Sequence, residues 1–185
     1  MKKIVLALTL GVACLVQASS VKWGLANPVD AGGNKYRVWT FIAADSSGTT
    51  AAGKLLSLAD AISMLENGDW ATLKTYNTKA GTLAADGTFS SATTADNDKW
   101  VAGVTLSGYA IIFDSTDKNL TGVTKYMVTD VVDITFANAA DAKTLGVTPT
   151  GTWARTPSGG GDVPEPTSGL LLLVGGAVMA LRRRR

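Results

Sequence analysis

Short apolar runs alternate with turn-forming residues through the middle of the chain, a pattern that is typical of β-strands. Residues 36–43 are β-branched and aromatic and have a turn-rich stretch on each side, which predicts a strand. The other expected strands cover residues 21–25, 125–132, 133–136 and 151–156, and residues 100–106 and 109–113 form either two strands or one bent strand. Ser107-Gly108 is expected as a bulge or turn, and residues 84–88 as the turn of a hairpin.

One segment has helical instead of strand periodicity. Four apolar residues recur at the spacing of one helical face: Leu55, Leu58, Ile62 and Leu65. Ser57 and Asp60 form a capping box that satisfies free N–H groups at a helix start, and Asn67-Gly68 provides a left-handed stop. We therefore expect one short helix over residues 58–66, packed on a sheet.

These elements predict the fold class of the body, which we place at residues 19–157. The strands are short, turn signals are frequent, and helices are too few for repeated βαβ units. The expected fold is mainly β: an antiparallel β-sandwich with one short helix. An Ig-like sandwich is one form that this fold can take. A signal helix precedes this body and a transmembrane helix follows it.

The first 18 residues have the three parts of a secretory signal peptide. Met1-Lys2-Lys3 is basic, residues 4–16 are apolar, and Val16 and Ala18 are small residues three and one positions before the expected cut. We expect export through the Sec translocon and removal of residues 1–18 by signal peptidase. A retained anchor helix is the alternative, although 13 apolar residues are short against the about 20 that a span needs. In a lipoprotein, a second alternative, Cys14 would become the N-terminus.

The C-terminal end has its own sequence of parts. Residues 158–162 form a Gly-rich linker, and the prolines of Pro164-Glu165-Pro166 keep the next stretch extended and accessible. An uncharged apolar segment follows over residues 169–181, and the chain ends in Arg182, Arg183, Arg184 and Arg185. We expect the apolar segment to stop in the inner membrane, with the arginines on the cytoplasmic side as a stop-transfer tail.

The energetics favour this topology but not a durable anchor. Each arginine gains about 1 kcal/mol near an anionic leaflet, whereas moving one to the bilayer centre costs about 3 kcal/mol or more. Residues 169–181 form a helix of only about 20 Å, against a hydrocarbon core of about 30 Å. A marginal span suits a tail that is removed, and a simple permanent anchor remains the alternative.

Residues 163–185 resemble the PEP-CTERM sorting signal of Gram-negative bacteria. The Pro164-Glu165-Pro166 triplet, the short apolar helix and the arginine end occur in the order of that signal, over 23 of 185 residues. The resemblance implies an exosortase, a membrane-embedded enzyme resembling a cysteine transpeptidase, as partner, and removal of the tail near the triplet. It also implies delivery to the cell surface or extracellular matrix, often beside exopolysaccharide.

The charge distribution and the His and Cys content exclude several classes of function. The net charge of +2 comes from the ends, because six of the 17 basic residues lie there and all 15 acidic residues lie between Asp30 and Glu165. The segment between the basic ends therefore carries a net charge of −4, which gives no electrostatic footprint for nucleic acid. There is no His, and Cys14 is the one Cys, so the body has no Cys/His metal site and no Cys nucleophile.

Five tryptophans are many for this length. We expect Trp39 and Trp100, which lie in apolar strands, to belong to the core. Trp70 follows Gly68-Asp69 and is the best candidate for an exposed ring that contacts a glycan. A carbohydrate-binding module on the same delivery system is therefore the alternative to a passive surface protein, with extracellular polysaccharide as the partner.

Other candidate sites are weaker. Asp96-Asn97-Asp98 and the loop 114–117 place oxygen ligands where Ca²⁺ binds in other proteins, but neither has EF-hand spacing, so we expect solvated turns. Asp117, Asn119 and Thr121 match a bacterial N-glycosylation pattern. Paired carboxylates can hydrolyse glycosides, yet no hydrolase or nucleotide fingerprint occurs, so a surface hydrolase is the third hypothesis. We expect a non-catalytic protein without cofactor or metal.

Overall fold

The computed structural model describes residues 19–48, 54–97, 100–138 and 141–156. The expected signal segment 1–18, with Val16 and Ala18, lies outside the described residues, as do the linker 158–162 and the whole sorting segment 163–185. In the described part of the chain, no helix has both the length and the apolar character needed to cross a bilayer.

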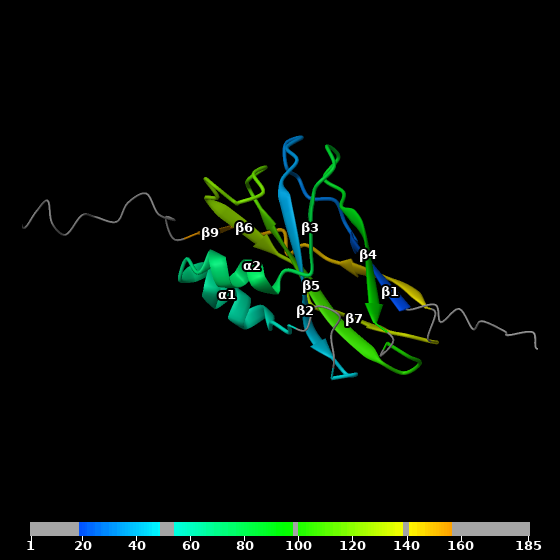
Figure 1. Cartoon of the computed structure of the whole chain (residues 1–185). Coiled ribbons are helices and arrows are strands. Elements are labelled where there is room, and N and C mark those ends of the chain that lie inside the picture. The colour runs from blue at the N-terminus through cyan, green and yellow to red at the C-terminus, as the bar shows by residue number, and fades with distance from the viewer. Residues whose placement is uncertain (1–18, 49–53, 98–99, 139–140, 157–185) are drawn as a thin grey trace, which may run out of the picture.

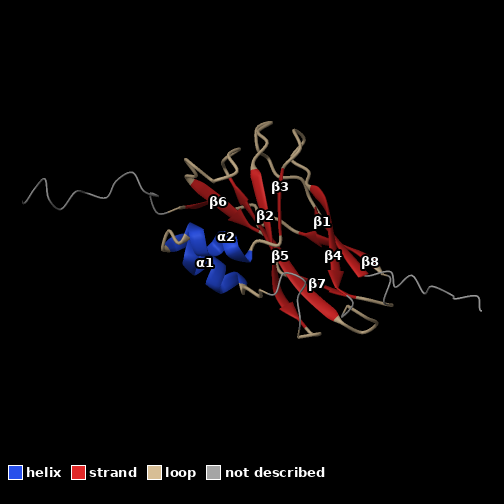
Figure 2. Ribbon diagram, in the orientation of Figure 1, coloured by secondary structure: helices blue, strands red, loops and turns tan. Residues whose placement is uncertain are grey.

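Nine strands and two helices occur in the described residues, so the body is mainly β as predicted (Figure 2). In chain order they are β1 (Ser19–Leu25), β2 (Arg37–Asp45), α1 (Leu58–Glu66), α2 (Trp70–Tyr76), β3 (Lys79–Thr82), β4 (Ser90–Asn97), β5 (Thr105–Phe113), β6 (Lys125–Val128), β7 (Val132–Thr135), β8 (Ala142–Val147) and β9 (Ala154–Arg155).

The strands form two sheets. The smaller sheet has the order β4-β1-β8, and the larger has the order β3-β2-β5-β6-β9, with β7 also pairing with β5. The sheets are largely antiparallel, as expected, but β1 runs parallel to β8 in the register Ser20↔Ala142 to Leu25↔Val147. These partners are more than a hundred residues apart, so the smaller sheet closes only when both ends of the body are in place.

The smaller sheet packs on one face of the larger sheet, and the two helices cover the other face (Figure 1). Trp23 and Leu145 of the smaller sheet share one buried cluster with Val38 and Ile112 of the larger sheet. Because the helices add a third layer and β1 pairs in parallel with β8, the finer expectation of a β-sandwich with Ig-like outline stays a prediction.

The second core lies between the larger sheet and the helices. Trp39 and Phe41 of β2 and Phe113 of β5 pack there against helix residues such as Leu65 and Leu73. Successive strand residues point to opposite faces of a sheet, so β2 and β5 contribute side chains to both cores in alternation. This explains why their sequences are continuous apolar runs.

The predicted helix is confirmed at its bounds, Leu58–Glu66, and packs on a sheet as expected. The backbone N–H of Asp60 donates to the Ser57 hydroxyl at 3.1 Å, and Asn67 caps the C-terminal end. One expected contact was wrong, because Leu55 precedes the helix and is 46% exposed. Leu56 is buried in its place, since its N–H donates to Ile42 and holds that stretch along β2.

The expectation of a single helix was wrong, because α2 follows α1 directly. Trp70, Leu73 and Tyr76 recur every three residues and pack in the second core, but the helix has only seven residues and Leu73 is its one fully buried side chain, so the spacing is a weak signal. Asp69 begins the helix, with its carboxylate accepting from the N–H of Thr72 at 3.3 Å. Asp69, directly before Trp70, is therefore a helix cap and not part of an open loop.

Several strand expectations need correction. The strand expected over 125–132 ends at Val128, and Val132 begins β7, while the strand expected over 151–156 covers only Ala154–Arg155. The strand expected over 100–106 begins only at Thr105, and Ser107-Gly108 lie inside β5. The irregularity lies opposite them, on β2 between Ile42 and Ala44. The turn at 84–88 forms, with the Ala84 N–H donating to the Thr88 carbonyl at 2.8 Å, but it joins β3 and β4, which belong to different sheets. It is therefore a crossover between sheets and not a hairpin.

Candidate functional site

The tryptophans divide into buried and half-buried side chains. Trp39 and Trp100 are at most 2% exposed, as predicted for core residues, and Trp23 is also buried. Trp70 and Trp153 are half-buried and lie at the margins of the two cores. These last two are the indoles that a ligand can reach.

Trp70 is less available than its sequence context indicated. Its ring packs edge-on against Phe113, with centroids 5.8 Å apart and an interplanar angle of 64°. Because α2 carries Trp70 against the larger sheet, much of the indole belongs to the second core. Glycan contact through Trp70 stays a prediction.

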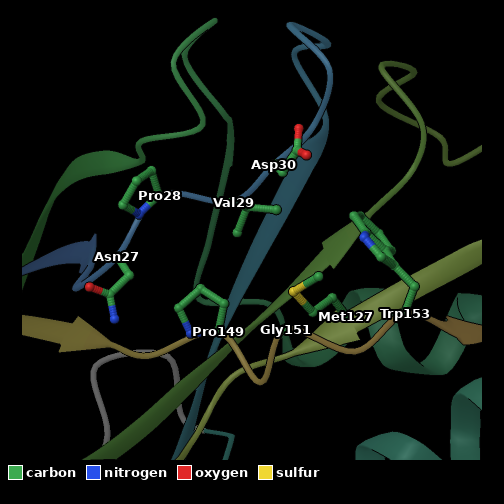
Figure 3. Close-up of a pocket in the computed structure, with 8 residues that line it drawn as sticks. All are labelled: Asn27, Pro28, Val29, Asp30, Met127, Pro149, Gly151 and Trp153. Carbon is green, nitrogen blue, oxygen red and sulfur yellow. The ribbon is translucent and has the colours of Figure 1, made fainter.

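A pocket of about 220 Å³ lies where three distant segments meet (Figure 3). The first segment follows β1, the second is β6, and the third connects β8 to β9. The residues that line the pocket are Asn27, Pro28, Val29, Asp30, Met127, Pro149, Gly151 and Trp153. Sequence reasoning missed this site because no local pattern indicates that these segments approach one another.

The base of the pocket is apolar and fixed by backbone contacts. Val29 and Met127 are at most 5% exposed. The Val29 N–H donates to the Gly87 carbonyl at 3.0 Å, which ties the first segment to the crossover turn between the sheets. Pro149 forms an isolated antiparallel bridge with Thr129, which holds the third segment beside β6.

Tyr36 and Lys125, which do not line the pocket themselves, both contact the Trp153 ring. The Tyr36 and Trp153 rings meet edge to face, with centroids 5.7 Å apart and an interplanar angle of 82°. The Lys125 Nζ lies 4.8 Å from the centre of the Trp153 ring, within range of a cation–π contact. Asp30 is exposed at the same pocket, and one of its carboxylate oxygens accepts from the Gly32 N–H at 3.1 Å.

The candidate calcium and glycosylation loops hold themselves together through their carboxylates. Asp114 accepts from the N–H and hydroxyl of Thr124, and Asp117 accepts from the N–H of Thr121. Hydrogen bonds from Thr121 and from the loop backbone lower the pKa of the Asp117 carboxyl. No group of three or more metal-ligating side chains occurs in the described residues. Asp96 and Asn97 lie in β4 and not in the expected turn, and Asp98 lies outside the described residues.

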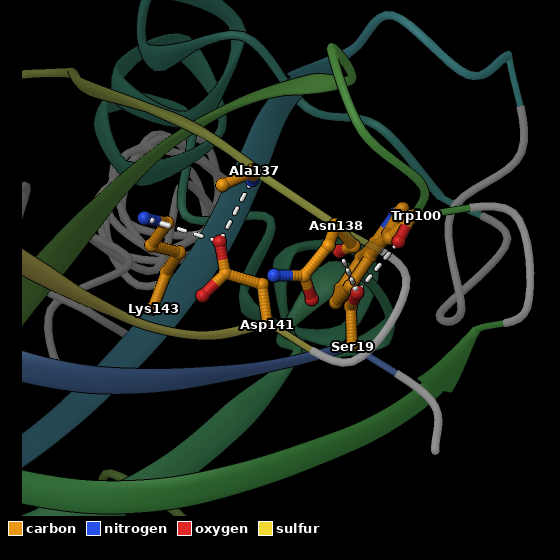
Figure 4. A network of polar contacts seen from close by, with 6 residues as sticks. All are labelled: Ser19, Trp100, Ala137, Asn138, Asp141 and Lys143. Atoms are coloured by element: carbon orange, nitrogen blue, oxygen red, sulfur yellow. Dashed lines mark hydrogen bonds and ion pairs between the residues drawn. The ribbon is translucent and has the colours of Figure 1, made fainter. Parts of the chain in front are cut away.

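Ser19, the first described residue, follows the predicted signal-peptide cut directly. Its side chain is fully buried, and its hydroxyl donates to the Trp100 carbonyl at 2.6 Å (Figure 4). Nearby, Asp141 accepts from the Ala137 N–H at 2.7 Å and pairs with Lys143 at 3.1 Å. These contacts lower the pKa of the Asp141 carboxyl, with the Ala137 hydrogen bond as the main cause.

Comparison with protein families decides the nature of the C-terminal segment. Residues 162–185 match the family model of the PEP-CTERM protein-sorting motif. The chain carries a PEP-CTERM sorting motif. The match contains Pro164-Glu165-Pro166 and the four terminal arginines, so the predicted resemblance is confirmed. A PEP-CTERM motif marks an exported protein that crosses the membrane and is processed by an exosortase.

The PEP-CTERM match covers 24 of 185 residues and leaves the body outside it. Searches of the curated proteins and of the solved structures find no match to the chain.

Proposed function

We propose that this chain is a non-catalytic cell-surface or extracellular-matrix protein whose PEP-CTERM tail an exosortase removes, and that it associates with exopolysaccharide. The observation that carries the proposal is the match of residues 162–185 to the sorting motif. Signal peptidase and the Sec translocon act on residues 1–18 at the other end, and the body between is the part that remains outside.

The order of charges and apolar residues supports the route. The uncharged segment 169–181 enters the inner membrane as the last part of the exported chain, and Arg182–Arg185 resist crossing. The body then lies outside the inner membrane with its tail end cytoplasmic, and Pro164-Glu165-Pro166 lies just outside the span. Cleavage there releases the body to the cell surface.

The local roles of the carboxylates support a non-catalytic body. Asp114, Asp117 and Asp141 accept hydrogen bonds from their own loops, and Asp45 holds the buried indole of Trp100 at 3.0 Å. A glycosidase needs two carboxylates that face each other across a bound sugar. These four carboxylates have structural partners of their own.

Replacement of Pro164-Glu165-Pro166 by three alanines in the native host tests the route. The variant is expected to accumulate as a chain with its C-terminus intact in the inner membrane, because the exosortase no longer recognises the tail. Replacement of Gly159-Gly160-Gly161 by alanines is the matched control and is expected to be processed normally. Normal processing of the triple-alanine triplet variant contradicts the proposal.

Carbohydrate binding is the second candidate function. The original candidate, Trp70, is half-buried against Phe113, whereas Trp153 lines a pocket that also contains polar groups. The pocket therefore favours carbohydrate binding, but at a different indole.

A further inference from the structure

We propose that the pocket lined by Trp153 and Asp30 binds one neutral sugar ring, of the pyranose class, as a unit of a polysaccharide. This inference extends the proposed association with exopolysaccharide. It depends on that proposed function only for where the sugar comes from. It assigns the contact to residues 27–30, 127 and 149–153 and not to Trp70.

The size of the pocket limits the ligand to a small group. Its volume of about 220 Å³ lies below the roughly 300–1,000 Å³ of pockets that enclose drug-sized ligands. Asn27, Pro28 and Asp30 are exposed, so the pocket opens to solvent on that side. One ring can therefore enter while the neighbouring units of a chain remain outside.

The chemistry of the lining matches the two kinds of surface on a sugar. The C–H groups of a pyranose carry partial positive charge and pack favourably against the negative face of an aromatic ring, which Trp153 provides. Met127 and Val29 give the apolar base. The Asn27 amide and the Asp30 carboxylate supply acceptors and donors for hydroxyl groups, and Asp30 has an oxygen beyond the one that bonds Gly32.

The charges at the pocket argue against ionic ligands. A quaternary ammonium group is the other ligand class that an indole and a carboxylate recognise. Here Lys125 already places its ammonium group 4.8 Å from the Trp153 ring, so a second cation would meet a like charge. An anion would meet Asp30 at the opening. A neutral hydroxylated ring meets neither penalty.

The test is a titration of the full chain, held in a detergent without a sugar headgroup, with D-glucose, D-galactose and D-mannose. Tryptophan fluorescence and saturation-transfer NMR report binding. We expect saturable binding of at least one of these sugars, weakened about tenfold by Trp153→Ala, which is the loss that about 1.4 kcal/mol of stacking gives. Trp153→Tyr keeps an aromatic ring and is expected to recover part of the affinity.

Two further variants keep the result interpretable. Asp30→Asn retains the oxygen that accepts from Gly32, lies at an exposed position, and is expected to weaken binding a few-fold through loss of a charged acceptor. Trp70→Ala is the matched control and is expected to bind as the parent chain does. Both variants should retain the far-UV circular dichroism and the cooperative urea unfolding of folded protein.

Three results overturn the inference. They are the absence of saturable binding of all three sugars, unchanged affinity in folded Trp153→Ala, and saturable binding of tetramethylammonium in place of the sugars. None of these results depends on processing of the tail in the native host. Failure of sugar binding is thus separable from failure of the sorting proposal.

Discussion

A Cβ atom placed on Gly108 would lie 2.6 Å from Cη2 of Trp23, so the indole of β1 occupies the space that a side chain on β5 would need. Gly108 lies in the strand that pairs with β2, β6 and β7, and Trp23 lies in the central strand of the smaller sheet. The same Cβ would lie 2.9 Å from Cδ1 of Leu145. The absence of a side chain at position 108 therefore sets the spacing between the two sheets.

Gly108→Ala is expected to destabilise the body by about 1–3 kcal/mol, the usual cost of an added methyl group in a filled core. The indole and the leucine must both move to admit the methyl group. The free energy of unfolding, measured by urea denaturation, reports the effect.

Gly146→Ala is the matched control, because a Cβ at this position of β8 meets no heavy atom within 4 Å. Its free energy of unfolding is expected to stay the same or to rise by less than about 1 kcal/mol, because alanine loses less backbone entropy on folding than glycine does. Equal losses in the two variants would show that close packing at Gly108 is not the cause.

A second glycine controls the pocket. Gly87 has φ +78°, and a Cβ there would collide with the backbone carbonyl of Val29. Gly87→Ala therefore combines backbone strain with displacement of the 27–30 segment, and we expect a lower thermal midpoint and altered Trp153 fluorescence. Gly48→Ala, at φ +73° with open space, carries only the strain, so a similar effect of the two variants contradicts this account.

The sequence predicted what short segments determine. The bounds of α1 follow from Ser57, Asp60 and Asn67, which act within one or two turns of the helix. The strong apolar runs became β2 and β5 because these strands bury both faces. Local signals of this kind need no knowledge of distant partners.

The features that the sequence did not predict depend on contacts between segments far apart in the chain. The parallel pairing of β1 with β8 joins the two ends of the body, and no local pattern selects that partner. Trp70 was expected to be an exposed ring because Gly68-Asp69 precede it, but Asp69 caps a helix and Trp70 packs on Phe113. Trp153 was missed as a site residue because its pocket forms only where residues 27–30 and Met127 lie beside it in the folded chain.

Tyr109 makes stability sensitive to alkaline pH. Burial, with a smaller contribution from the Asp60 charge, raises the pKa of its phenol far above the usual value near 10. Its hydroxyl donates to the carbonyls of Leu56 and Ser57 at 3.1 and 3.2 Å. The group is therefore protonated in the folded chain at a pH where the unfolded chain ionises.

Because the folded-state pKa is the higher one, the stabilisation is complete below pH about 10 and is lost as the pH rises above that value. Tyr109→Phe is expected to cost about 1 kcal/mol at neutral pH through lost hydrogen bonds and to reduce the decline in stability above pH about 10. Tyr126 is still present in this variant, and its pKa is also raised, mainly by burial. A smaller decline in stability above pH about 10 is therefore expected to remain. Denaturation curves at several alkaline pH values measure both effects, and an unchanged slope would contradict the assignment to Tyr109.

Trp100 and Asp45 form a buried polar pair. The indole Nε1 donates to Oδ2 of Asp45 at 3.0 Å, and the two residues are 1% and 8% exposed. Trp100→Phe keeps an aromatic ring but leaves the carboxylate oxygen without this donor, at an expected cost of about 1–3 kcal/mol. Trp70→Phe, which retains a ring against Phe113, is expected to cost less; the reverse order in urea denaturation would argue against the role of this hydrogen bond.

The intact mass of the protein isolated from its native host tests the central claim most directly, because one spectrum reports both ends of the chain. We predict a mass that lacks residues 1–18 and also lacks the apolar segment and the arginines that follow Pro164-Glu165-Pro166. A mass corresponding to the whole chain, from Met1 to Arg185, would contradict the claim that the two ends are sorting signals that the host removes.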